Sequence, residues 1–293
     1  MTSPTYVLAT DSCCDLPAEL VEDLGLVVLE FPFTLEGAQH YDDLGRSMSS
    51  AEFYGRMREG AAPTTAQVPM SEYLAAFTAA AEAGTPMVLL SFSSGLSGTY
   101  DAAVVARNAV VAENPGIDIR VIDTLSASVN QGLLVLETAR QWRRGATIDQ
   151  LVDFVEASKM RINGFFTLLT LDSLGRGGRL SEVAAMAGAM LDVKPVLHVN
   201  AAGLMTIDRA VRGRKKSLRA LAEIFDARAG DMSSRTVLVA HADTPDDADA
   251  MAAMLRERRE IYQIITCEIG PVIGSHTGPG MIAIVFWGQE RDS

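Results

Sequence analysis

The residues best suited to binding chemistry form a hydroxyl-rich stretch, SFSSGLSGTY, at positions 91–100. The short apolar run at 87–90 predicts a buried strand before it, and the alanine-rich run at 101–111 predicts a helix after it. Unpaired backbone N–H groups and the positive end of a helix dipole meet in such a turn, which favours a carboxylate or phosphate. The same residues are also typical of an ordinary helix cap, and this stretch alone leaves both interpretations open.

Acids and hydroxyls also follow two other predicted strands, at 6–10 and 119–122. These residues are Asp11, Ser12, Asp123 and Thr124. Because the carboxyl ends of parallel strands meet at one edge of a sheet, the repetition predicts a shared pocket along that edge. Repeated helix capping explains the pattern almost as well, and Asp15 in the sequence Asp-Leu-Pro is itself typical of a helix N-cap.

His276 stands in a second segment of interest, GSHTGPG at 274–280. Glycine and proline dominate this segment, which predicts a loop with a closely specified backbone. Loops of that kind more often position a reactive or binding side chain than fill a core. His276 is therefore a candidate site residue.

The order of strands and helices predicts an α/β fold with two domains. The chain of 293 residues is long for one core. Strands alternate with helices up to residue 160, so we expect an N-terminal parallel-sheet α/β domain at 1–160. The runs 194–199 and 204–207 alternate like antiparallel partners, which predicts a C-terminal α/β domain with a mixed sheet at 161–293.

Composition excludes several classes of protein. A net charge of −12 argues against nucleic acid and anionic membrane surfaces as partners. No apolar run is long enough to span a bilayer, no signal peptide is evident, and the three cysteines lack disulfide or metal-ligand spacing. We therefore expect a cytoplasmic protein without a metal or other cofactor.

One basic cluster departs from the acidic composition. Six basic residues fall within 209–219, at the start of a helix-like stretch. Such a cluster is either a solvated face or a docking surface for an acidic protein partner.

Several motifs, taken together and in order, resemble the DegV family of bacterial fatty-acid-binding proteins over nearly the whole chain. They are 10–12 (TDS), 15–17 (DLP), 93–100 (SSGLSGTY), 177–180 (GGRL), 194–195 (KP) and 276–280 (HTGPG). The family's threonine-serine-glutamine loop stands here as TTAQ at 64–67. Its serine is replaced by Ala66, which makes Thr65 the expected hydroxyl donor.

The resemblance implies that one long-chain fatty acid lies in a tunnel between the two domains. By the family pattern its carboxyl end contacts Thr65, Ser94, Ser97, Gly98, His276 and Thr277. Six large apolar residues fit either the tunnel wall or a core: Phe92, Phe165, Phe166, Met186, Met190 and Met281.

The resemblance also implies a carrier subunit without catalytic activity of its own. A separate ATP-dependent fatty acid kinase would convert the bound carboxylate to an acyl phosphate for phospholipid synthesis. Its docking residues on this chain would be Arg176, Arg179, Arg209 and Arg212. The sequence contains no P-loop, which fits a partner that brings the nucleotide.

Two other functions stay open at this point. In a serine hydrolase or acyltransferase, Ser94 or Ser97 would be the nucleophile, His276 the base, and Asp11 or Asp123 the residue that orients it. The G-x-S-x-G elbow of such enzymes is not present. The other alternative is a lipid sensor that has no kinase partner.

Overall fold

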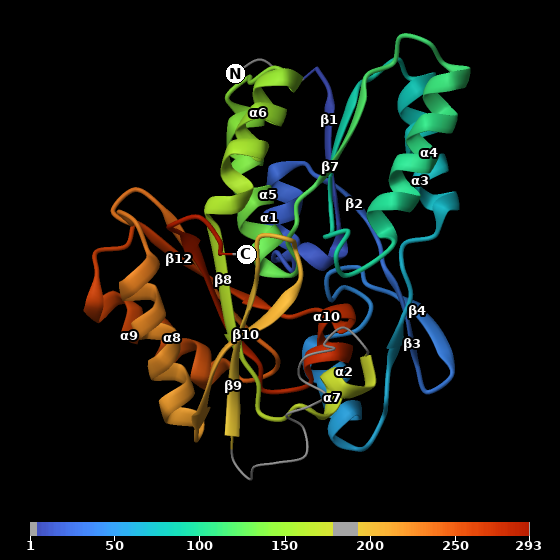
Figure 1. Ribbon diagram of the computed structural model, residues 1–293. Helices are drawn as coiled ribbons and strands as arrows, with labels where there is room; N and C mark the ends of the chain where they lie inside the picture. Colours follow the sequence, from blue (N-terminus) through green and yellow to red (C-terminus); the bar gives the residue numbers. More distant parts are fainter. Residues whose placement is uncertain (1–4, 178–192, 293) are drawn as a thin grey trace.

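A computed structural model describes residues 5–177 and 193–292 of the chain. The described residues form two main sheets flanked by helices, and a third, smaller sheet (Figure 1). The predicted fold class is confirmed: one main sheet is parallel and the other is mixed.

The first sheet has the strand order β2-β1-β6-β7, and all its pairings are parallel. Its strands are β1 (Val7–Asp11), β2 (Val27–Leu29), β6 (Met87–Ser91) and β7 (Ile119–Asp123). The helices that follow or connect them are α1 (Ala18–Leu24), α3 (Met70–Glu82), α4 (Thr99–Glu113), α5 (Val129–Arg143) and α6 (Ile148–Ser158). Every residue of β6 is buried, as its unbroken apolar run predicts.

The second sheet has the order β10-β9-β8-β13-β11-β12, in which only β11 and β12 pair in parallel. Its strands are β8 (Ile162–Thr167), β9 (Val193–Val199), β10 (Met205–Arg212), β11 (Thr236–His241), β12 (Gln263–Glu268) and β13 (Ile282–Trp287). The helices α8 (Arg214–Arg228) and α9 (Pro245–Arg258) lie on its outer side (Figure 1). The antiparallel pair predicted around 200–203 is confirmed as β9 and β10.

The third sheet was not predicted from the sequence, which indicated only a polar segment at 36–50. It consists of β3 (Pro32–Leu35), β4 (Ala38–Tyr41) and β5 (Thr64–Thr65). Glu36 and Gly37 both have positive φ, as a two-residue hairpin turn requires. The helix α2 (Ser50–Arg58) follows, and Ser49 caps it through a hydrogen bond from the Glu52 N–H. The sheet matters to the site because Thr65 pairs with Phe33 of β3.

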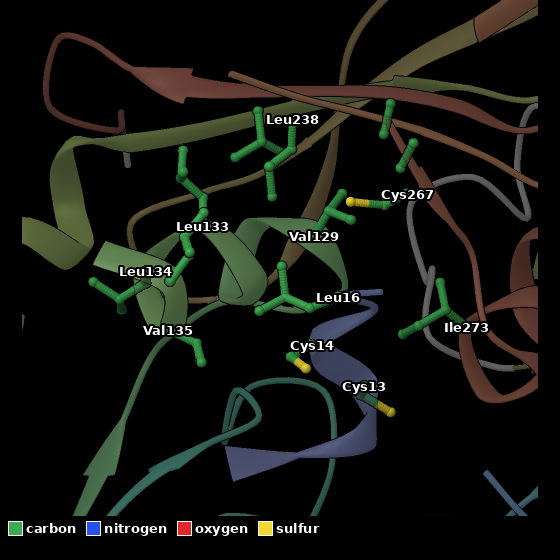
Figure 2. Packing of buried hydrophobic residues seen from close by; sticks show 14 of the residues in the cluster. Cys13, Cys14, Leu16, Val129, Leu133, Leu134, Val135, Leu238, Cys267 and Ile273 are labelled. Carbon is green, nitrogen blue, oxygen red and sulfur yellow. The ribbon is translucent and has the colours of Figure 1, made fainter. Parts of the chain in front are cut away.

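Helix α5 lies between the two main sheets and packs against both. Figure 2 shows Val129 and Leu133 of α5 between Leu238 of β11 and Leu16 of the N-terminal segment. Cys13, Cys14 and Cys267 are buried, unpaired members of the same core. The domain boundary expected near residue 160 stays a prediction; it falls in the short turn Lys159–Arg161 between α6 and β8.

Two short helices complete the described chain. They are α7 (Asp172–Gly177) and α10 (Pro271–Thr277). The prediction of a loop around His276 is wrong, because His276 lies in the last turn of α10. Proline opens the helix and Gly278, at φ 74°, follows its end, so the residues that suggested a loop are helix start and stop signals. The helix expected to reach Leu191 lies outside the described residues.

Candidate functional site

An apolar cavity of about 870 Å³ lies between the carboxyl edge of the first sheet and the inner face of the second. Loops after the strands β2, β6 and β7 supply one wall, and β8, β9, β10 and β13 supply the other. The first turn of α5 and one side of α10 close it. A cavity does lie at the strand ends, with the second sheet as its opposite wall, but none of the residues from which a shared pocket was predicted, Asp11, Ser12, Asp123 and Thr124, lines it.

Thr65 and His276 form a polar pair at one end of this cavity. The Thr65 Oγ1 and His276 Nε2 atoms are 2.8 Å apart, although 211 positions separate the residues in the chain. The neighbouring Ala66 and Gln67 line the cavity and are exposed, so this end lies at the mouth. When His276 Nε2 donates to the Thr65 oxygen, the Thr65 hydroxyl can donate its own proton to an anion at the mouth.

The position of His276 depends on how α10 is held. The Tyr54 hydroxyl donates a 2.9 Å hydrogen bond to the Ile269 carbonyl, just before the helix. Gly274 leaves room for that ring, since a Cβ there would lie 2.4 Å from the Tyr54 oxygen. The Gly270 N–H donates to Asp15 Oδ1 at 2.9 Å, and Asp15 Oδ2 accepts from Ser128 at 2.5 Å. Asp15 thus joins α10 to the start of α5.

That role corrects the interpretation of Asp15 as the N-cap of the next helix. The N-cap of α1 is Pro17, and it makes no side-chain cap bond. Asp15 instead has φ 50° after a short turn, which directs its carboxylate inward, where it is 3% exposed. Nothing in the local sequence indicates its partners, because Ser128 and Gly270 are distant in the chain.

The serine-rich turn places its residues differently with respect to the cavity. Ser97 lines it; its hydroxyl donates to Thr99 Oγ1 at 3.0 Å and accepts from the Thr99 N–H at 3.3 Å. Ser94 and Gly98 are exposed and are not lining residues. Gly98 is the N-cap of α4 and lies against Gln67, whose Oε1 would be 2.5 Å from a Cβ there.

Thr277 lines the cavity beside His276 and is buried. Its hydroxyl donates to the Ile273 carbonyl at 3.1 Å, which leaves its oxygen as an acceptor only. Four of the six predicted ligand residues, Thr65, Ser97, His276 and Thr277, therefore meet at the cavity.

The large apolar residues divide between the cavity wall and the core. Phe92, Phe166 and Met281 line the cavity. Phe165 points to the other side of β8, where it stacks on His198 and Phe286. Met186 and Met190 lie outside the described residues.

The two candidate acids of the hydrolase alternative hold turns and do not contact His276. Asp11 accepts from the Phe92 N–H at 2.7 Å and from Gln131 at 3.1 Å, and burial raises its pKa to about 7. Asp123 accepts from the N–H groups of Ser94 and Leu125. No hydrogen bond joins His276 to Ser94 or Ser97, all three of which lie in the described part of the chain. Among the described residues, these side chains do not make the hydrogen bonds of the Ser-His-Asp arrangement considered above.

A second cavity, of about 980 Å³, lies on the other side of Gly270. Four acids line it: Asp15, Glu19, Asp42 and Glu268. Burial raises the pKa of Asp15 to about 7 and that of Asp42 well above its usual range. The two cavities thus share one structural element, the start of α10, and differ in charge.

The four predicted docking arginines stay a prediction, and the structure describes two of their side chains. Arg209 and Arg212 are exposed on β10, the edge strand whose first residue, Met205, lines the cavity. Asp208 forms a 2.5 Å ion pair with Arg209. Arg176 belongs to α7, and Arg179 lies outside the described residues.

Across residues 5–177 and 193–292, no helix has the length and apolar character needed to cross a membrane. Within the same ranges, no three His, Cys, Asp or Glu side chains are grouped to hold a metal ion.

Fold and cavity define a class: an α/β protein with two sheets and, between them, an apolar cavity that is polar at its mouth. The model of the DegV family, described as "Uncharacterised protein, DegV family", matches residues 6–289. A DegV domain-containing protein of Clostridium perfringens is 37% identical over 98% of this chain and 99% of its own length. This chain belongs to the DegV family, which confirms the resemblance in its motifs.

Solved structures agree with this assignment. A DegV family protein from Thermus thermophilus, described by its fatty acid binding, superposes with a TM-score of 0.87 at 29% identity, covering 97% of this chain and all of that one. A stearic-acid-binding protein from Eubacterium ventriosum superposes with a TM-score of 0.82 at 26% identity, covering 96% of this chain and 98% of that one.

Proposed function

We propose that this protein binds one long-chain fatty acid in the first cavity, with the carboxylate at the mouth and the acyl chain inside. The observation that carries the proposal is the Thr65–His276 pair, 2.8 Å apart, at one end of a cavity whose other walls are mostly apolar. Its similarity to fatty-acid-binding structures supports the same ligand.

In this arrangement the carboxylate accepts from the Thr65–His276 pair, and Ser97 and Thr277 lie beside it. Ser94 and Gly98 contribute through the turn that positions Ser97. Charge-assisted hydrogen bonds of this kind are roughly twice as strong as neutral ones. Each buried methylene of the acyl chain adds about 0.8 kcal/mol of favourable transfer free energy.

The proposal includes a partner, a separate ATP-dependent fatty acid kinase. A carboxylate oxygen attacks the γ-phosphorus of ATP, the bond to the bridging oxygen breaks, and ADP leaves, so that an acyl phosphate remains for phospholipid synthesis. This chain supplies binding and orientation and does no chemistry. The reaction takes place in the cytoplasm, where ATP is available.

Surface charge and exposure support that partner. Ala66 and Gln67 are exposed at the mouth, so a carboxylate there is within reach of a second protein. Arg209 and Arg212 are exposed on β10, the strand whose first residue, Met205, lines the same cavity. In the proposal they dock an acidic face of the kinase together with Arg176 and Arg179.

Experiments on delipidated protein test both the fatty acid binding and the kinase partner of this proposal. Calorimetry with stearic acid is expected to give binding at one-to-one stoichiometry, and a fluorophosphonate probe is expected to leave Ser94 and Ser97 unlabelled. With the kinase subunit of the same organism and ATP, hydroxylamine is expected to trap the acyl phosphate as a hydroxamate. Arg209→Ala with Arg212→Ala should reduce hydroxamate formation and leave stearate binding unchanged. Labelling of either serine by the probe would favour the hydrolase instead.

A further inference from the structure

Asn130 lines the first cavity, and its side-chain acceptor atom takes no part in the site described above. Asn130 belongs to the first turn of α5 and is 3% exposed. Its Nδ2 donates to Ser126 Oγ at 3.0 Å. Its Oδ1 has no hydrogen-bond partner in the described part of the chain. An unpaired buried acceptor costs free energy, so a group that satisfies it gains that free energy on binding.

The Asn130 amide faces the cavity because its neighbour has no side chain. It lies against Gly164 of β8, where a Cβ would be 2.9 Å from Oδ1. Gly164, Val129 and Val285 surround it and also line the cavity. Any side chain at position 164 would cover the amide. The glycine therefore leaves the Asn130 amide open to the cavity.

Asn130 and the polar pair lie on different elements of the cavity wall. Asn130 is in the first turn of α5 and lies against Gly164 of β8, which pairs with Val285 of β13. Thr65 is on β5 and His276 is on α10. A ligand group that meets Asn130 is then distinct from the carboxylate that Thr65 and His276 hold.

We infer that the preferred ligand is a long-chain fatty acid with a hydroxyl group on its acyl chain, which donates to Asn130 Oδ1. The inference rests on the proposed function and names the substrate class of the same site. Asn130 is then a specificity residue that touches the ligand. An unsubstituted chain would place methylenes against the unpaired acceptor, whereas a hydroxyl satisfies it.

The inference does not depend on which way the amide is oriented. If the Asn130 amide is turned over, Oδ1 accepts from Ser126 and Nδ2 faces the cavity. A hydroxyl both donates and accepts, so it pairs with either atom. A keto group only accepts and would pair with Nδ2 alone. A hydroxylated chain is therefore the class that suits both orientations.

Calorimetry with two acids on delipidated protein tests the inference. The probes are stearic acid and 10-hydroxystearic acid, which differ by one hydroxyl. Wild type is expected to bind the hydroxy acid about tenfold more tightly, a difference of about 1.4 kcal/mol. Asn130→Leu, of nearly equal size, is expected to remove that preference. Asn130→Ser retains a hydroxyl and should keep part of it.

Val285→Ala is the matched control, because it changes the shape of the wall at the same depth without changing its polarity. It should alter the affinity for both acids by a similar factor.

Each outcome decides a different claim. Equal affinity of wild type for the two acids, or an equal change for both in Asn130→Leu, would overturn the inference and leave fatty acid binding intact. If wild type binds neither acid, the proposed function fails and the inference fails with it. Should Asn130→Leu not fold, the ratio of the two affinities in wild type and in Asn130→Ser decides whether the hydroxyl is recognised.

Discussion

The two cavities of this protein share the start of α10 and differ in the chemistry of their walls. The first is lined mostly by apolar side chains and has Thr65 and His276 at its mouth. Four acids are among the residues that line the second. The apolar walls of the first stabilise an acyl chain, and the acids of the second do not attract a carboxylate. The polarity and charge of the walls therefore distinguish the two cavities as sites for a fatty acid.

The same helix start separates them, so the cavities are linked mechanically. Asp15, on the acidic side, accepts from Gly270, and His276 lies at the other end of α10. Four substitutions test how far the two cavities are independent in function.

The largest effect is expected from filling the first cavity. Ala283 on β13 lines it and is 3% exposed. Ala283→Phe places a ring where the acyl chain lies, so stearate affinity should fall about 100-fold by calorimetry, or about 2.7 kcal/mol. The matched control is Ala18→Phe, which adds the same ring to the second cavity. It should change the affinity less than about twofold, and an equal loss in both variants would contradict the assignment of the ligand to the first cavity.

A smaller effect is expected at the mouth. Thr65→Val keeps the shape of the side chain and removes the hydroxyl that pairs with His276. Loss of a hydrogen bond to a charged group should weaken stearate binding about tenfold. Thr64→Val, on the exposed neighbouring residue of β5, is the control and should bind as wild type does. If the two variants cannot be distinguished, Thr65 does not hold the carboxylate.

The acids of the second cavity should make the stability of the folded protein depend on pH. Burial raises the pKa of Asp15 from 3.8 to about 7 in the folded protein. The stability that protonated Asp15 contributes is complete below pH 3.8 and is lost as the pH rises through about 7. Denaturant titrations should therefore show the free energy of unfolding falling across this window, with a slope of about 1 kcal/mol per pH unit from this group.

Asp15→Asn should flatten that fall, because the amide remains neutral. Asp23→Asn, on an exposed side chain of α1, is the control and should retain the wild-type slope. A wild-type slope in Asp15→Asn would show that Asp15 does not carry a buried proton. Stearate affinity, in contrast, should change little between pH 6 and 8 if the cavities act separately.

The smallest effect is expected from Ala66→Ser, which restores the hydroxyl found in the family's loop. Ala66 is an exposed lining residue at the mouth. One more solvent-accessible donor should strengthen stearate binding about threefold, or about 0.7 kcal/mol. Ala66→Cys adds a side chain of nearly equal size with a weak donor and should have little effect. Stronger binding by both variants would indicate packing instead of hydrogen bonding.

Most strands could be predicted because their signals are local. The strand β13 (Ile282–Trp287), for example, is an unbroken apolar run that follows a glycine-rich segment. The β3–β4 hairpin was missed because its strands have four residues each and β4 carries Gln39 and His40. The helix α10 was mistaken for a loop because glycine and proline also mark helix ends.

The site could be predicted only in part, because contacts between distant residues are not written in local patterns. Thr65 and His276 were matched through the family motif, and the sequence alone does not place them 2.8 Å apart. Asn130 left no signal, because only the rotation of α5 against Gly164 turns its side chain toward the cavity. The same holds for Asp15, whose buried position depends on a backbone turn at positive φ.

Native mass spectrometry of the purified protein, followed by denaturing organic extraction, tests the central claim most directly. The account predicts a one-to-one adduct that survives native spraying and extracts as a free long-chain fatty acid. Ala283→Phe, prepared in parallel, should carry no adduct. A wild-type mass equal to that of the bare polypeptide, with no adduct after fatty acids are added back, would contradict the claim that this cavity holds a fatty acid.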